Sequence, residues 1–218
     1  MSFASPASRA EAVDVILLQA PVLPVIVIEH LEDALPLARA LVDGGLPVLE
    51  ITLRTDAALS AISAIAAELP GALVGAGTVL NPEDLTRAQS AGARFAISPG
   101  ATEALYHAAE RTVMPWIPAV ATASDVMNGL AHGHRRFKFF PAESSGGIAA
   151  VKSFGGPFPN VRFCPTGGID AAKAPAYLAL PNVVTVGGSW MLPADALKQR
   201  DFARIQALAA EASTLRKR

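Results

Sequence analysis

Three charged residues stand inside segments that otherwise have the apolar character of buried β-strands. Lys138 lies between aromatic residues in the run RFKFFP, while Glu50 and Arg54 lie in the run PVLEITLR. An amine in an apolar pocket loses the solvation of its charged form, so it becomes a nucleophile that can form a Schiff base with a carbonyl compound. A carboxylate beside it can transfer protons, and a guanidinium can hold an anion. These residues predict covalent amine catalysis.

A purely structural interpretation of the same residues stays open. In a strand of alternating faces, Val48, Glu50, Thr52 and Arg54 share one face, which we expect to point into the interior. A buried charge is costly unless it is paired or used. A structural ion pair of Glu50 with Arg54, or of Glu50 with Lys138, would meet that requirement without any catalysis.

Two glycine pairs close two later apolar runs, as Thr166-Gly167-Gly168 and as Gly187-Gly188-Ser189. Glycines at strand ends let backbone N–H groups approach an oxyanion, and phosphate commonly binds after the last two strands of a parallel barrel. The two pairs therefore predict a phosphate site. Thr78 and Pro99 end two earlier runs and are expected to complete the same rim.

The elements that must position these residues can be read from the apolar pattern. Eight short runs rich in β-branched residues begin near Val22, Pro47, Leu73, Phe95, Met114, Arg136, Val161 and Val183. An alanine-rich stretch of helical pattern lies in each gap between them, for example 31–44, 56–69, 82–91, 103–111, 124–133 and 171–180. Alternating strands and helices predict parallel pairing. We therefore expect one domain over residues 1–218, an α/β fold of the (β/α)₈ TIM barrel type.

Two further features of the pattern refine this expectation. An extra N-terminal helix is expected over 8–19, and one or two helices over 195–214. An open doubly wound sheet is the alternative, but the turn after the first strand, Glu29-His30-Leu31-Glu32, lacks the dinucleotide-binding glycine pattern.

The composition excludes several classes of function. Hydrophobic residues make up 51% of the chain and charged residues 17%, with a formal net charge of -1. These values argue against disorder and against binding nucleic acid or an anionic membrane. The densest apolar run, 22–28, is too short to span a membrane, and MSFASPASRAEA has no signal-peptide pattern, so a cytoplasmic protein is expected. The low charge also hints at an oligomer.

Several other residues carry no functional prediction. Cys164 is the single cysteine, so it forms no internal disulfide. His132 and His134 precede a strand, which places them at the end of the barrel opposite the site, and no cluster has metal-ligand spacing. We expect neither a metal nor a cofactor, and we expect Arg135 and Arg136 to be solvated.

Longer motifs carry a resemblance to a known family. They are LEITLRT (49–55), VGAGTVLNPEDL (74–85), FAISPG (95–100), FKFFPAE (137–143), GPFPNVRFCPTGGI (156–169) and GGSWMLPADAL (187–197). Over about 22–193 the chain resembles the 2-keto-3-deoxy-6-phosphogluconate (KDPG) aldolases, also called 2-dehydro-3-deoxy-phosphogluconate/4-hydroxy-2-oxoglutarate aldolases. The resemblance implies a metal-free class I aldolase, typically a homotrimer, that cleaves KDPG to pyruvate and glyceraldehyde 3-phosphate in the Entner–Doudoroff route.

The resemblance also implies roles for individual residues. Lys138 would be the Schiff-base lysine and Glu50 the acid/base. The positions that match the pyruvate subsite are Arg54, Thr78 and Thr166. Pro99 and Phe140 match the pocket walls. The phosphate end is matched by Gly167, Gly168, Gly188 and Ser189. Thr166 favours the gluconate-type enzyme over its galactonate-type relative. One departure is the segment 118–122, PAVAT, where family members more often have PGIST.

Other functions remain as alternatives at this point. One alternative is an aldolase of the same type whose main substrate is unphosphorylated 4-hydroxy-2-oxoglutarate or the phosphogalactonate epimer. A non-catalytic barrel that binds a phosphorylated sugar is a third possibility, although a binding protein has no need to bury an amine.

Overall fold

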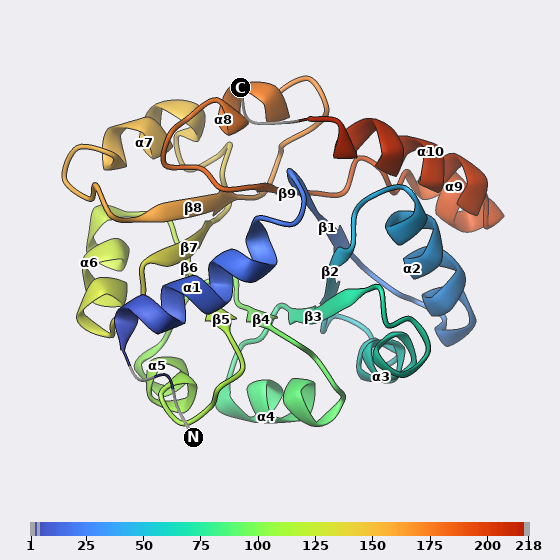
Figure 1. The fold of residues 1–218 in the computed structure, drawn as a ribbon, viewed down its shortest axis with the longest axis horizontal. Helices are drawn as coiled ribbons and strands as arrows, with labels where there is room; N and C mark the ends of the chain where they lie inside the picture. The colour runs from blue at the N-terminus through green and yellow to red at the C-terminus, as the bar shows by residue number, and fades with distance from the viewer. Residues whose placement is uncertain (1–2, 4, 216–218) are drawn as a thin grey trace.

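Parallel strands alternate with helices along the chain in the computed structural model, which describes residue 3 and residues 5–215 (Figure 1). The strands are β1 (Val22–Ile26), β2 (Val48–Thr52), β3 (Leu73–Gly77), β4 (Ala96–Ile97), β5 (Trp116–Ile117), β6 (Ala119–Val120), β7 (Arg136–Phe139), β8 (Arg162–Pro165) and β9 (Val186–Gly188). The helices are α1 (Pro6–Leu17), the 3₁₀ turn η1 (Leu31–Asp33), α2 (Ala34–Asp43), α3 (Ala58–Glu68), α4 (Pro82–Ser90), α5 (Glu103–Ala109), α6 (Ala123–Ala131), α7 (Gly147–Phe154), α8 (Ala174–Leu178), α9 (Ala194–Gln199) and α10 (Phe202–Ser213).

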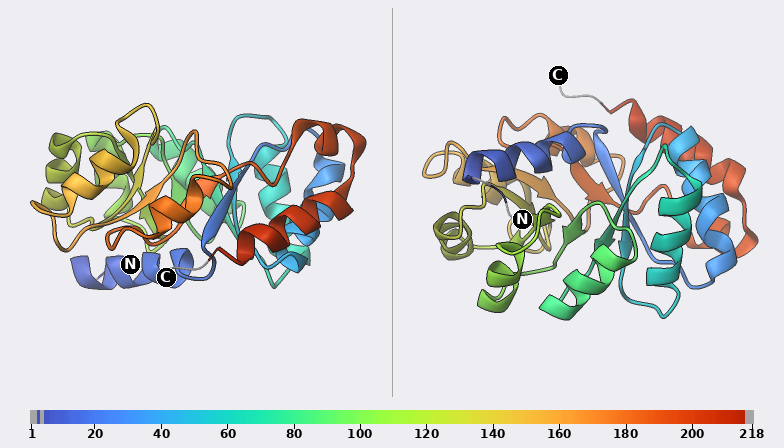
Figure 2. Two further views of the ribbon diagram at one scale, coloured as in Figure 1. Left: turned by 90° about the horizontal axis from the view of Figure 1, so that it is seen from above. Right: turned by 60° about the horizontal axis from the view of Figure 1, so that its bottom comes forward.

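The strands form two curled parallel sheets. One has the order β5-β4-β3-β2-β1-β9 and the other the order β6-β7-β8. Isolated parallel bridges, Phe163 to Val183 and Thr166 to Gly187, connect β8 with the segment that contains β9. The chain therefore has an α/β fold in which helices cover the outer face of curved parallel sheets (Figure 2).

The fifth expected strand is divided in two. Pro118 separates β5 from β6, and proline has no backbone N–H to donate to a ladder. β5 pairs with β4, whereas β6 pairs with β7, so the break between the two sheets falls at this proline. The last strand begins at Val186, three residues later than its apolar run predicts.

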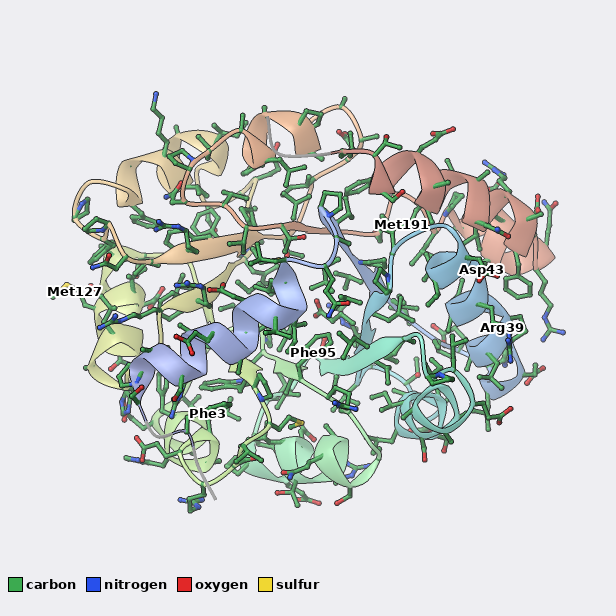
Figure 3. All side chains as sticks on the ribbon, viewed as in Figure 1. Phe3, Arg39, Asp43, Phe95, Met127 and Met191 are labelled. Carbon is green, nitrogen blue, oxygen red and sulfur yellow. The ribbon has the colours of Figure 1, made fainter. Side chains whose placement is uncertain are left out.

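The hydrophobic residues form two clusters on opposite faces of the strands. The larger one lies between strands and outer helices, and it includes Phe137 and Phe139. The smaller one fills the interior with side chains from several strands and with Phe95, which directly precedes β4 and lies centrally among the strands (Figure 3). Alternation along each strand explains why neighbouring residues enter different clusters.

The extra N-terminal helix covers the amino ends of the strands. Val13, Ile16 and Leu17 of α1 belong to the inner cluster, so the helix closes the interior at that end (Figure 1). A capping box at Ser5 begins the helix. Arg136 of β7 donates two hydrogen bonds of 2.6 Å to Asp14 of α1, so the expectation that Arg136 is solvated was wrong.

None of the helices within residues 5–215 has the length and hydropathy that crossing a membrane requires. The predicted domain also includes residues 1, 2, 4 and 216–218, which lie outside the described residues. The first three of these belong to the segment that was predicted to have no signal-peptide pattern.

Candidate active site

Lys138 and Glu50 meet on the inner side of the curled sheets. Lys138 comes from β7 and Glu50 from β2, and Lys138 Nζ lies 2.9 Å from Glu50 Oε1 and 3.3 Å from Oε2. The residues are 6% and 1% exposed. Two strands far apart in the sequence thus bring an amine and a carboxylate into hydrogen-bond contact, away from bulk water.

The backbone beside Glu50 leaves room for its carboxyl group. Gly77 lies in the adjoining strand β3, and a Cβ atom there would approach Glu50 Cγ to 2.6 Å. Any side chain at this position would force the carboxylate to move, so the glycine that ends the GAG run of β3 helps to set the position of Glu50.

The surroundings favour exchange of a proton between the two groups. Lys138 Nζ lies 5.4 Å from the centre of the Phe140 ring, so an aromatic ring borders the amine. Both partners are withdrawn from water, and each is the other's hydrogen-bond partner. The short hydrogen bond gives the proton a direct path from Nζ to Oε1.

The buried thiol next to this pair is not a second nucleophile. Cys164 lies beside Lys138 in the register of β7 and β8. Burial raises the pKa of its thiol to about 12, an effect only partly opposed by the charge of Lys138. The thiol therefore stays protonated, and thiolate chemistry is excluded at ordinary pH.

The position of Arg54 corrects the expectation from sequence. β2 ends at Thr52, so Arg54 lies in the following turn and is exposed rather than pointing inward from the strand. Its Nε donates a hydrogen bond of 3.1 Å to Thr78 Oγ1, which leaves the two terminal nitrogens that suit a carboxylate. Arg54 carries no buried charge and forms no pair with Glu50.

Thr78 has an unusual backbone conformation. Its φ is +58°, in the left-handed region that β-branched residues rarely adopt. It follows β3 directly, so this backbone turn carries its hydroxyl to Arg54. Strain of this kind persists where the surroundings impose it and is concentrated at functional sites.

Pro99 and Phe140 border one cavity, whose wall includes neither Lys138 nor Glu50. The cavity has a volume of about 250 Å³, and its wall includes Ala119 and Val120 of β6 and Asp125 of α6. The structure thus brings together the two residues predicted as pocket walls.

The two glycine pairs lie next to each other. The bridge between Thr166 and Gly187 joins the segments that carry them. Gly167 and Gly168 have φ values of +106° and +77°, whereas Gly188 is buried at the end of β9 and Ser189 is exposed after it. The backbone N–H groups of this edge and the Ser189 hydroxyl are donors suited to a phosphate.

Three residues at this edge had no predicted role. Glu143 carboxylate oxygens accept hydrogen bonds from the Tyr177 hydroxyl and, at 3.0 Å, from Lys173 Nζ. Glu143 belongs to the motif FKFFPAE, but only this pairing across two connecting segments distinguishes it from an ordinary surface acid. Spacing in the sequence gives no signal for such a contact.

The two histidines expected at the opposite end do lie there, near α1. His134 is buried and its Nε2 is 2.6 Å from Arg9 Nη1. The His132 ring stacks on Tyr106, and His132 also contacts Glu103 and Glu110. Within residues 5–215, no group of three His, Cys, Asp or Glu side chains is placed to hold a metal ion.

Known proteins resemble the chain over most of its length. A family model described as KDPG and KHG aldolase matches residues 13–208. The KHG/KDPG aldolase of Escherichia coli (strain K12) is 56% identical over 197 residues, which are 90% of this chain and 92% of that protein.

Two solved structures share both sequence and fold. The KDPG aldolase from Legionella pneumophila, with pyruvate captured at low pH as a covalent carbinolamine intermediate, is 48% identical with a TM-score of 0.91, over 92% of this chain and 98% of that one. The 2-keto-3-deoxy-6-phosphogluconate aldolase of Zymomonas mobilis ZM4 with 3-phosphoglycerate is 52% identical with a TM-score of 0.92, over 95% and 98%. On these matches, this chain belongs to the KDPG and KHG aldolase family.

Proposed function

We propose that this chain is a class I aldolase that cleaves KDPG reversibly to pyruvate and D-glyceraldehyde 3-phosphate. The observation that carries the proposal is the buried contact of 2.9 Å between Lys138 Nζ and Glu50 Oε1. It supplies the amine and the acid/base that Schiff-base chemistry needs, in a chain whose relatives are named for this reaction. A phosphosugar-binding protein would gain nothing from such a pair.

The first half of the reaction builds the imine. Glu50 accepts the proton of the Lys138 ammonium, and the neutral amine attacks the C2 ketone of KDPG. Glu50 then returns a proton to the carbinolamine oxygen, which leaves as water. The resulting protonated imine attracts electrons from the neighbouring carbon atoms.

The second half breaks and discards the carbon chain. Glu50 removes the proton from the C4 hydroxyl, the C3–C4 bond breaks, and its electron pair moves into the imine to form an enamine. Glyceraldehyde 3-phosphate leaves, C3 takes up a proton, and water hydrolyses the imine to release pyruvate and free Lys138. A positioned acid/base contributes about 10²–10⁴-fold to such steps.

The remaining residues position the substrate. Arg54, held at Nε by Thr78, would bind the substrate carboxylate together with Thr166. Pro99 and Phe140 would enclose the carbon chain. The phosphate would lie at Gly167, Gly168, Gly188 and Ser189.

Trapping with borohydride tests the proposal. Incubation with pyruvate and sodium borohydride should leave one reduced adduct, which peptide mass mapping should place on Lys138. A chain that cleaves KDPG without any adduct on Lys138 would refute the role of this amine, and a chain with neither adduct nor cleavage would refute the aldolase.

A second activity has one observation in its favour. The Escherichia coli relative is named for both KHG and KDPG. Cleavage of 4-hydroxy-2-oxoglutarate by the same Lys138 and Glu50 is therefore the second candidate, and a comparison of kcat/KM for the two substrates decides which is preferred. For the phosphogalactonate epimer, the same comparison with both epimers measures selectivity at C4.

We also propose that residues 1–218 form one domain with a closed (β/α)₈ barrel. Support comes from the short connection between β5 and β6 through Pro118 and from the Thr166–Gly187 bridge between the two sheets. A cytoplasmic location is proposed because a charged, phosphorylated keto acid does not cross membranes freely. A homotrimer is the assembly that the family resemblance implies. Light scattering on the purified chain measures the oligomer.

A further inference from the structure

A small polar network stands behind the glycine pair at the expected phosphate end. Lys173 Nζ donates a hydrogen bond of 2.8 Å to the carbonyl oxygen of Gly168 and contacts Glu143 Oε2 at 3.0 Å. The other oxygen of Glu143 accepts a hydrogen bond from Tyr177. One carboxylate thereby connects a lysine and a tyrosine of the segment after β8 to the segment after β7.

The backbones of the same two segments are also joined. The Glu143 N–H donates to the carbonyl oxygen of Gly167 at 3.1 Å, and the Ala142 N–H donates to that of Thr166 at 2.8 Å. A Cβ atom on Gly168 would lie 2.8 Å from Glu143 Cγ, so glycine is required for this approach as well as for its φ of +77°. The Gly167–Gly168 loop is thus fastened to Glu143 from several sides.

The protonation states suit a lasting contact. Tyr177 is fully buried at 0% exposure, and burial together with the bond to Glu143 raises the pKa of its hydroxyl, which remains a donor. The bonds from Tyr177 and Lys173 lower the pKa of Glu143, although both charged groups are well exposed to solvent. The lysine charge offsets a carboxylate that would otherwise repel a phosphate, and Asp170 adds to that negative charge nearby.

We propose that Glu143, Lys173 and Tyr177 are positioning residues that hold the Gly167–Gly168 loop in the conformation that binds the substrate phosphate. This inference rests on the proposed function. It makes the contribution of the three residues specific to the phosphorylated half of the substrate, because Lys138 hydrogen-bonds Glu50 and not the Glu143 network.

The test compares two reactions of one enzyme. Cleavage of KDPG needs the phosphate site, whereas exchange of the pyruvate methyl protons with D₂O, followed by NMR, needs only the imine and enamine at Lys138. Lys173→Met should raise KM for KDPG by about tenfold, as expected for the loss of a hydrogen bond and of a compensating charge. Its exchange rate with pyruvate should stay within about twofold of the parent chain.

Three further variants sharpen the result. Tyr177→Phe keeps the buried ring and should give a smaller rise in KM, and Lys173→Arg should restore most of the affinity. Lys152→Met removes another exposed lysine, on α7, and should change neither reaction. Because the residues act as one unit, the double variant Glu143→Gln with Lys173→Met should raise KM for KDPG by less than the product of the two single-variant increases.

The outcomes separate the inference from the proposed function. An unchanged KM for KDPG in Lys173→Met, or equal losses in cleavage and exchange, would overturn the positioning role. Absence of pyruvate exchange in the parent chain would instead overturn the aldolase function, whatever the variants do.

Discussion

Strand β7 carries two cations on one face, and each is paired with a carboxylate from another element. Arg136 bonds Asp14 of α1 through two contacts of 2.6 Å at the amino end of the strand. Two residues later, Lys138 contacts Glu50 of β2 at 2.9 Å. The strand thus has similar electrostatics at both positions, but the two pairs differ in what their cation can do.

A guanidinium keeps its proton in proteins, whereas an amine can give its proton up. The planar fork of Arg136 matches the carboxylate of Asp14 and fastens the helix that closes the interior. Lys138 is more deeply buried, its side chain being 7% exposed against 16% for Arg136. The proposed chemistry therefore uses the pair that is more deeply buried and contains an amine, whereas the Arg136–Asp14 pair connects β7 to α1.

Replacing the amine of the Lys138–Glu50 pair with a guanidinium should have the largest effect on activity. Lys138→Arg keeps a cation beside Glu50 but removes the amine that forms the imine. Turnover of KDPG should fall by at least about 10⁴-fold, the scale for loss of a covalent nucleophile. Steady-state cleavage and borohydride trapping measure it, and circular dichroism checks the fold. Substantial activity in this variant would mean that Lys138 is not the nucleophile.

Glu50→Gln should have the next largest effect. The amide retains a hydrogen bond to the amine but can no longer accept its proton, so kcat should fall by about 10²–10⁴-fold. Loss of the countercharge favours the neutral amine, so pyruvate should still be trapped on Lys138. Glu50→Asp serves as the control that keeps the charge but shortens the reach. Full activity of Glu50→Gln would remove this carboxylate from the mechanism.

The sequence predicted most of the elements, and the positions of Lys138 and Glu50 within strands, because both have local signals. Apolar runs mark the strands, and a lysine inside such a run is conspicuous. The point where a strand ends has no such signal, which is why Arg54 was expected to face inward from β2 although it lies in the turn beyond. A helix was expected between each pair of strands, but no bounds were predicted for α7, whose run GIAAVKSF follows a stretch rich in serine and glycine.

Contacts between distant segments account for the other errors. The bond of Arg136 to Asp14 joins residues that are 122 positions apart, and Glu143 meets Tyr177 across 34. In the sequence, the basic run at Arg136 and the single acid Glu143 resemble surface residues, because their partners come from distant segments. Side chains whose roles depend on tertiary pairing are therefore the ones that local patterns cannot identify.

The fastening pair should respond to a conservative change in stability rather than in rate. Arg136→Lys keeps the charge but loses the two parallel hydrogen bonds to Asp14, so the free energy of unfolding should drop by about 1–2 kcal/mol. Urea unfolding measures this loss. The variant should retain kcat and KM, and trapping should show no adduct at the introduced amine. A loss of activity without a loss of stability would contradict the division of roles along β7.

The amino end of β7 should also set a smaller, pH-dependent effect. Burial, together with the nearby charges of Arg9 and His132, lowers the pKa of His134 to about 3. The unfolded chain binds this proton near pH 6.5, so the stabilisation is complete above that pH and is lost as the pH falls toward 3. In His134→Gln the amide oxygen still accepts a hydrogen bond from Arg9. Between pH 7.5 and pH 6 the free energy of unfolding should fall by about 0.8 kcal/mol less in this variant than in the parent chain. Urea unfolding at both pH values measures the difference, with His107→Gln, an exposed histidine, as the control. Parallel behaviour of parent and His134→Gln would show that this end of the strand does not sense acid through His134.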